Sequence, residues 1–123
     1  MKIKTSELTG KALDWAVALA QGWQKMADYN GYSTPNGVVI ASEYAPSWDW
    51  EVCGQLIDEY LDSLTRMCTD SPWVASCKAV TVDDVSIWKV EGGQTPKIAL
   101  CRALVSAKMG DEVEIPDELL EAE

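Results

Sequence analysis

Two indoles flank one carboxylate in residues 47–50, Ser-Trp-Asp-Trp, directly after Pro46. Flat rings beside a carboxylate can stack on a planar ligand and accept its hydrogen bonds, and indoles are favoured at interfaces. The same residues also suit a helix start, with Ser47 as the cap and Asp49 near the positive end of the helix dipole. The stretch therefore predicts either a binding site or a helix start, and both interpretations stay open.

The two indoles of this stretch cannot serve the same purpose on a helix. Residues two apart point about 160° away from each other at 3.6 residues per turn. Trp50 lies three residues before Cys53, so we expect it at the edge of the core. Trp48 is then expected near solvent, where an exposed indole indicates a contact surface.

A second candidate turn is Gly92-Gly93-Gln94-Thr95-Pro96. Thr95 is expected to cap a helix that has Pro96 in its first position. The glycine pair could present N–H groups to an anion with help from Arg102, but the lysine of a phosphate-binding loop is missing. Arg102 is either an anchor for a carboxylate or phosphate, or a half-buried structural arginine.

The two turns supply the candidate binding residues, because they could meet and form one cleft. The residues are Ser47, Trp48, Asp49, Trp50, Thr95 and Arg102.

The residue types argue against common catalytic chemistry. The chain has no histidine, so neither a Ser-His-Asp nor a Cys-His mechanism can be built from it. Its four cysteines show no CxxC pair and are expected to be reduced and buried, with a metal site or a regulatory thiol as the alternatives. No metal and no cofactor are predicted. We therefore expect a protein that is not an enzyme, with a small enzyme that uses carboxylates such as Asp49 as an alternative.

The negative charge is concentrated at one end of the chain. The net charge is −10, and residues 111–123 hold seven acids and no base, whereas residues 1–110 have a net charge of only −3. No basic stripe could bind a phosphate backbone, so direct nucleic-acid binding is not expected. We expect a single domain over residues 1–110 and an acidic tail over 111–123. An acidic inhibitor that occupies a nucleic-acid-binding surface is another alternative.

Hydrophobic spacing predicts an α+β fold with the order β-α-β-α-β-β-α. A small antiparallel sheet of three or four strands is covered by about three helices. The first helix is capped by Thr9 and ends before Gly22, a loop spans 28–37, and the second helix carries an apolar stripe from Cys53 to Leu64. The remaining expected elements are strands at 2–4, 38–40, 73–80 and 85–90, and a third helix from Thr95 to Gly110. The last two strands are expected to form an antiparallel hairpin with a short link at 81–84.

The location of the protein is predicted from what the chain lacks. It has no apolar stretch long enough to span a membrane and no signal-peptide core near residue 1, so we expect it in the cytosol without membrane contact. A homodimer through a sheet edge or a helix face is compatible with the sequence.

Three segments in their order carry a family resemblance: KIKTSELTGKALDWAVALAQG, YAPSWDW and GGQTPKIALCRALVSAKMGDEVEIPDEL. They resemble the phage NinX-like family, small proteins of temperate phages and prophages of enteric bacteria. The Ser-x-Asp-Trp helix start and the later Thr-Pro…Cys-Arg-Ala helix are also similar to the phage α-β-α sandwich domain. Where the family often has Ser-Thr-Asp-Trp, this chain has Trp48 in second place.

The resemblance implies a phage accessory protein in the host cytoplasm and supplies no catalytic residues. Together with the missing catalytic set, it leads to the main hypothesis. The protein binds a host protein or a small-molecule ligand, in a role that could counter host defence.

Overall fold

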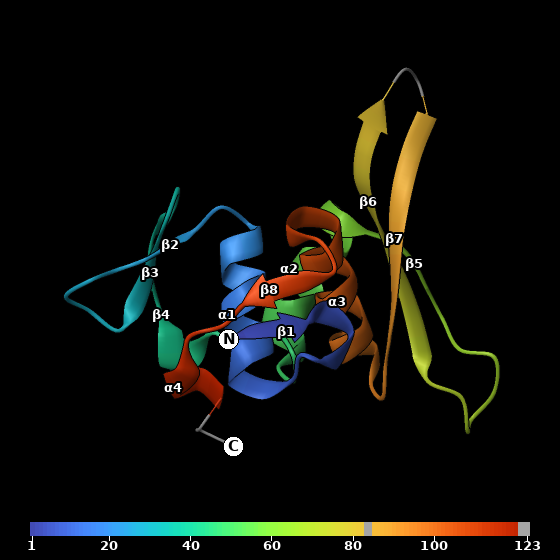
Figure 1. Cartoon of the computed structure of the whole chain (residues 1–123), viewed down its shortest axis with the longest axis horizontal. Helices are drawn as coiled ribbons and strands as arrows, with labels where there is room; N and C mark the ends of the chain where they lie inside the picture. The colour runs from blue at the N-terminus through green and yellow to red at the C-terminus, as the bar shows by residue number, and fades with distance from the viewer. Residues whose placement is uncertain (83–84, 121–123) are drawn as a thin grey trace.

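The computed structural model describes residues 1–82 and 85–120 and confirms the α+β class (Figure 1). The chain order differs from the expected one, because more strands form than the hydrophobic pattern indicates. The strands are β1 (Lys2–Lys4), β2 (Gln24–Lys25), β3 (Gly31–Thr34), β4 (Gly37–Ile40), β5 (Leu61–Thr65), β6 (Trp73–Val82), β7 (Val85–Gly93) and β8 (Glu112–Glu114). The helices are α1 (Gly10–Ala20), α2 (Trp50–Tyr60), α3 (Pro96–Met109) and α4 (Asp117–Leu120), with short 3₁₀ turns η1 (Thr5–Glu7) and η2 (Ala41–Glu43).

The strands form three small antiparallel sheets where one sheet of three or four strands was expected. Their orders are β1-β8, β2-β3-β4 and β5-β6-β7. The three long helices lie between the β2-β3-β4 sheet on one side and the β5-β6-β7 sheet on the other (Figure 1). The helices, and not a central sheet, therefore form the middle of the molecule.

The core is built on α1 and α3. These helices pack against each other, and α3 also covers one face of the β5-β6-β7 sheet. Leu13 and Val17 of α1 and Leu100 and Leu104 of α3 are fully buried. Their spacing of four residues places each pair on one helix face.

The start and end of α3 confirm the sequence prediction. Thr95 caps the helix by accepting a hydrogen bond from the Ile98 N–H at 3.1 Å, and Pro96 occupies the first turn. Gly110 ends the helix with a φ of 93°, which a side chain would disfavour. Gly93 is needed for close packing, because a Cβ there would lie 2.7 Å from the Ala99 nitrogen.

The second helix is shorter than predicted, because its last apolar residues belong to a strand. Helix α2 ends at Tyr60, and Leu61 and Leu64 lie in β5 opposite Cys77 and Ala75. The register shifts between Leu61 and Ser63. A bulge adds one residue to the two-residue period of a strand, so the two leucines face the same side at a spacing that imitates a helix.

The expected loop at 28–37 contains a strand that the sequence did not indicate. Strand β3 pairs with β4, and the second strand confirms the expectation for residues 38–40. The turn between them contains Pro35 and Asn36. The many turn residues of this segment concealed a four-residue strand.

Residues 112–115 of the acidic end pack on the domain, where a tail was expected. Strand β8 pairs with β1, and both Val113 and Ile115 are buried. The N-terminal amine forms an ion pair with Glu114 and donates to the Ile115 carbonyl at 3.0 Å. The carboxylates of this strand point outward because they alternate with the apolar residues.

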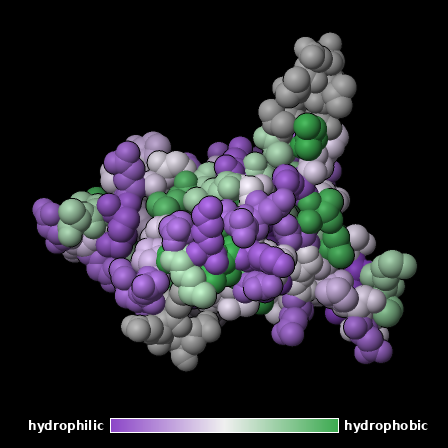
Figure 2. Space-filling model, viewed as in Figure 1, coloured by the Kyte–Doolittle hydropathy of each residue, from purple (hydrophilic) through white to green (hydrophobic). Residues whose placement is uncertain are grey.

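Strands β6 and β7 form the predicted antiparallel hairpin, and residues 83–84 of its expected link lie outside the described residues. The described strands project beyond the helices (Figure 1), and hydrophobic side chains gather on them (Figure 2). Trp88 and Val90 are exposed and pair with Lys78 and Ser76 on the face away from α3. This face lacks the second helical layer that the α-β-α resemblance implies, as far as the structure is described.

Within residues 1–82 and 85–120, the structure has no helix that is long and apolar enough to cross a membrane.

Candidate ligand-binding pocket

A pocket of about 340 Å³ opens between α1, β3, the segment around η2, and α4. It contains one of the predicted site residues, Trp48, together with residues far from it in the sequence. The lining residues are Lys11, Asp14, Trp15, Asn30, Tyr32, Ala41, Ser42, Tyr44, Ala45, Trp48 and Leu119.

Asp14 is the buried acid of this pocket. Only 8% of the residue is exposed, and one of its carboxylate oxygens accepts the Ser47 N–H at 2.8 Å. Burial raises the pKa of Asp14 to about 6, although the donation from Ser47 acts in the opposite direction. In the described part of the chain Asp14 forms no salt bridge, so its charge is poorly compensated.

Two tyrosines of the pocket are held rigidly by their neighbours. The ring centroids of Tyr32 and Tyr44 lie 6.2 Å apart, and Trp23 lies 4.8 Å from Tyr44. The side-chain amide of Gln21 donates to the Tyr44 hydroxyl at 2.6 Å. The buried rings are thus fixed in edge and tilted contacts before any ligand arrives.

Trp48 stands at the opening of the pocket. It is 73% exposed, as expected, although helix α2 begins only at Trp50. Lys11, one turn before Asp14 on α1, and Ser42 are also exposed around the pocket. The pocket therefore has an inner part with Asp14, Tyr32 and Tyr44, and a polar, solvent-exposed rim.

The prediction that Ser47 caps the second helix is wrong. Asp49 is the cap, because its carboxylate accepts the Glu51 N–H at 3.0 Å and helix α2 begins at Trp50. Ser47 lies before the helix and is buried, with its N–H bonded to Asp14. The residue joins the 47–50 turn to helix α1.

The prediction that Trp50 lies at the core edge is wrong, because the residue is 50% exposed. The Lys97 ammonium lies 4.6 Å from the centre of the Trp50 ring. Trp50 shares the helix face of Cys53, but at the first turn of α2 this face meets the start of α3. The two helix starts are therefore neighbours through Trp50 and Lys97.

Arg102 has the structural role that was one of its two interpretations. Its Nε donates to the Leu8 carbonyl and one terminal nitrogen donates to the Gly92 carbonyl, both at 2.9 Å. Burial lowers the pKa of Arg102. Neither Thr95 nor Arg102 lines the Asp14 pocket. This pocket is therefore not the single cleft that was expected between the two turns.

Sequence reasoning missed Asp14, Lys11 and the two tyrosines as site residues. Asp14 did carry a signal, because it is the one acid of the largely apolar segment 10–20. A carboxylate beside buried positions must find a donor or lose its charge. Tyr32 and Tyr44 offered no such signal, since they lie in a segment rich in turn residues.

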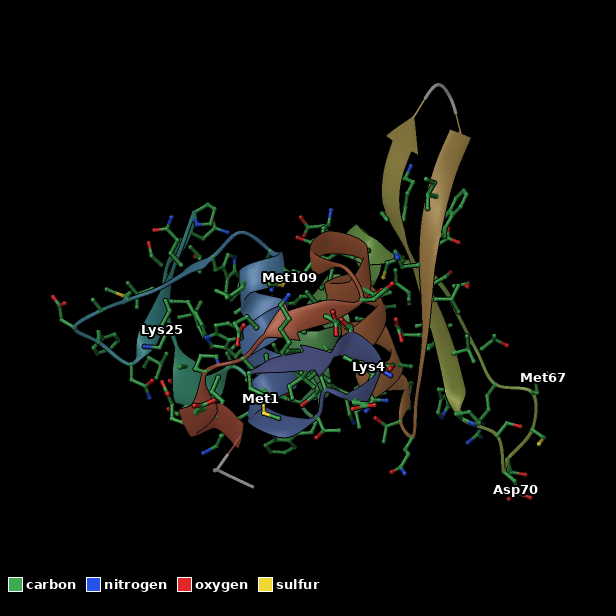
Figure 3. The ribbon with its side chains drawn as sticks, viewed as in Figure 1. Met1, Lys4, Lys25, Met67, Asp70 and Met109 are labelled. Carbon is green, nitrogen blue, oxygen red and sulfur yellow. The ribbon has the colours of Figure 1, made fainter. Side chains whose placement is uncertain are left out.

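Three cysteines are buried as predicted, whereas Cys68 is exposed. Cys68 lies between Met67 and Asp70 in the loop from β5 to β6, which stands away from the helices (Figure 3). All four thiols are free. Among the described residues no three His, Cys, Asp or Glu side chains are grouped so that they could hold a metal ion.

The fold and the pocket define a small α+β protein with a fixed aromatic pocket and one buried carboxylate. The family model described as Bacteriophage P22, NinX matches residues 4–108, and the chain belongs to this family. This confirms the resemblance carried by the three sequence segments. No curated protein matches the chain.

Proposed function

We propose that this NinX-family member is a phage accessory protein that acts in the host cytoplasm by binding a ligand and not by catalysis. The proposed binding site is the Asp14 pocket. The observation that carries the proposal is a buried carboxylate in a pocket that four aromatic residues line: Trp15, Tyr32, Tyr44 and Trp48.

The charge on Asp14 is more than the fold itself requires. An asparagine could accept the Ser47 N–H without bringing a charge into the interior. Raising the carboxyl pKa from 3.8 to about 6 corresponds to a cost of about 3 kcal/mol at neutral pH. A costly ionisable group inside a pocket is typical of a functional site.

The size of the pocket favours a small molecule over a protein surface. Its volume of about 340 Å³ falls in the lower part of the range of small-molecule sites, which begins at roughly 300 Å³. We therefore propose a small-molecule ligand, with a host protein as the alternative. Withdrawing such a ligand from the host cytoplasm would be one means of countering host defence.

Affinity capture during infection tests this proposal, with both proteins and metabolites identified by mass spectrometry. Tagged wild type is compared with Trp48→Ala and with Trp88→Ala, which changes an exposed tryptophan on the distant hairpin. We expect a small molecule on wild type and Trp88→Ala, and none on Trp48→Ala. Retention of every ligand by folded Trp48→Ala would contradict the proposal. Loss of a bound protein only from Trp88→Ala would also contradict it, because the binding site would then lie on the hairpin.

A further inference from the structure

We infer that the Asp14 pocket takes a small organic cation, whose charged group meets the Asp14 carboxylate and whose flat part stacks on Trp48. This inference rests on the proposed function, because it names the ligand class of the same pocket.

The first argument is the uncompensated charge of Asp14. Its carboxylate accepts the Ser47 N–H and, among the described residues, has no cationic partner within salt-bridge distance. A buried carboxylate is stabilised far more by an opposite charge than by one neutral donor. A bound cation would supply the counter-charge that the protein itself leaves out.

The second argument is the aromatic lining. The negative faces of aromatic rings attract cations, and cages of several rings are a known means of binding organic ammonium groups. Here the tyrosines and two tryptophans line the same pocket as the acid. Trp48 is the most exposed of them, so its ring is free to cover a ligand.

The third argument comes from the other titratable groups around Asp14. The Asp14 charge acts on the phenols of Tyr32 and Tyr44 and on the thiols of Cys53 and Cys101. Neither a phenol nor a thiol carries a positive charge in either protonation state. Lys11 is the one basic residue that lines the pocket, and it is exposed. An anion would have to rely on Lys11 while it faced Asp14.

The charge of the whole chain acts in the same direction. A net charge of −10 attracts cations and repels anions before contact is made. The pocket and the surrounding field therefore both favour a cationic ligand.

Three indoles with the same ring and different charges test the inference: tryptamine, tryptophol and indole-3-acetate. Calorimetric titration of the full chain at pH 7.5 should give binding in the order tryptamine, tryptophol, indole-3-acetate. Tryptamine should bind about tenfold more weakly at pH 5, because a carboxyl group with a pKa of about 6 is mostly protonated there. Its amine remains charged at both pH values.

Two variants separate the charge of Asp14 from that of Lys11. Asp14→Asn keeps an acceptor for Ser47. The variant should bind tryptamine at least about tenfold more weakly, because the charge-assisted contact is lost, while its affinity for tryptophol should change little. Lys11→Gln should leave tryptamine binding equal or tighter. The inference is overturned if indole-3-acetate binds as tightly as tryptamine, if Lys11→Gln abolishes binding, or if none of the three compounds binds. The capture experiment would still decide the proposed function in each of these cases.

Discussion

Asp14 makes the stability of the fold depend on pH through one buried side chain. Its pKa is about 6 in the folded protein and 3.8 is the ordinary value, so the folded state binds the proton more tightly than the unfolded chain. The contribution of this group is fully favourable below pH 3.8 and is lost as the pH rises through 6. The cost therefore falls on the protein at neutral pH, where a ligand would act.

Asp14→Asn should consequently become more favourable as the pH rises. Between pH 4 and pH 7.5 the free energy of unfolding of the variant, relative to wild type, should increase by about 2–3 kcal/mol. Urea denaturation at the two pH values measures this difference. Asp58→Asn, at an exposed position of α2, controls for the loss of one negative charge, and an equal response in both variants would contradict the assignment.

Arg102 is expected to matter for stability and not for ligand binding. It donates to two carbonyls from separate elements, Leu8 before α1 and Gly92 in β7. Lysine cannot reproduce the two-pronged geometry, so Arg102→Lys should destabilise the fold by about 1–3 kcal/mol. Thermal unfolding measures the loss, and tryptamine affinity of the folded variant should stay within twofold of wild type.

A clear fall in the tryptamine affinity of the folded Arg102→Lys variant would contradict this purely structural role.

At the scale of elements, helix α2 owes its start to Asp49. Its carboxylate accepts the Glu51 N–H, which satisfies one of the free donors of the first turn. Asp49→Ala should cost about 1 kcal/mol, and Asp49→Ser should recover most of it. Chemical denaturation of the two variants tests the assignment, which is wrong if serine gives no recovery.

The acidic end is a second element whose role can be tested. Ile115 is fully buried and β8 completes a sheet with β1. Ile115→Ala should destabilise the protein by about 2–4 kcal/mol. Glu118→Ala, at an exposed position of α4, should change stability by less than about 0.5 kcal/mol. Equal small effects in differential scanning calorimetry would indicate that the end does not pack on the domain.

Sequence predicted the elements whose ends carry local signals. The Thr95-Pro96 start and the Gly110 end of α3 could be read directly because capping depends on neighbouring residues. Strand β5 could not, since its bulge gives Leu61 and Leu64 a helical spacing. The alternation of Glu112, Val113, Glu114 and Ile115 is typical of a strand, but the density of acids led to the prediction of a tail.

The pocket could be predicted only in part, because its parts come together through tertiary contacts. The 47–50 turn supplied Trp48, and the bond from Ser47 to Asp14 spans 33 residues of sequence. No local pattern links helix α1 to this turn or to Tyr32. Sequence therefore identified the rim of the site and missed its buried acid.

At the scale of the whole molecule, the net charge should affect how cations reach the pocket. Raising NaCl from about 20 mM to about 500 mM shortens the range of the field to a few ångströms. Tryptamine affinity should fall several-fold over this range, while tryptophol affinity should change little. Calorimetry with both compounds at both salt concentrations checks the expectation, and equal salt responses would contradict it.

The titration of the Asp14 carboxyl carbon by NMR tests the central claim most directly. We predict a pKa of about 6 for Asp14 in the free protein, and a lower pKa when tryptamine is bound, because a cation stabilises the ionised form. A carboxyl that titrates near pH 4 in the free protein, or one whose pKa is unchanged by saturating tryptamine, would contradict the account.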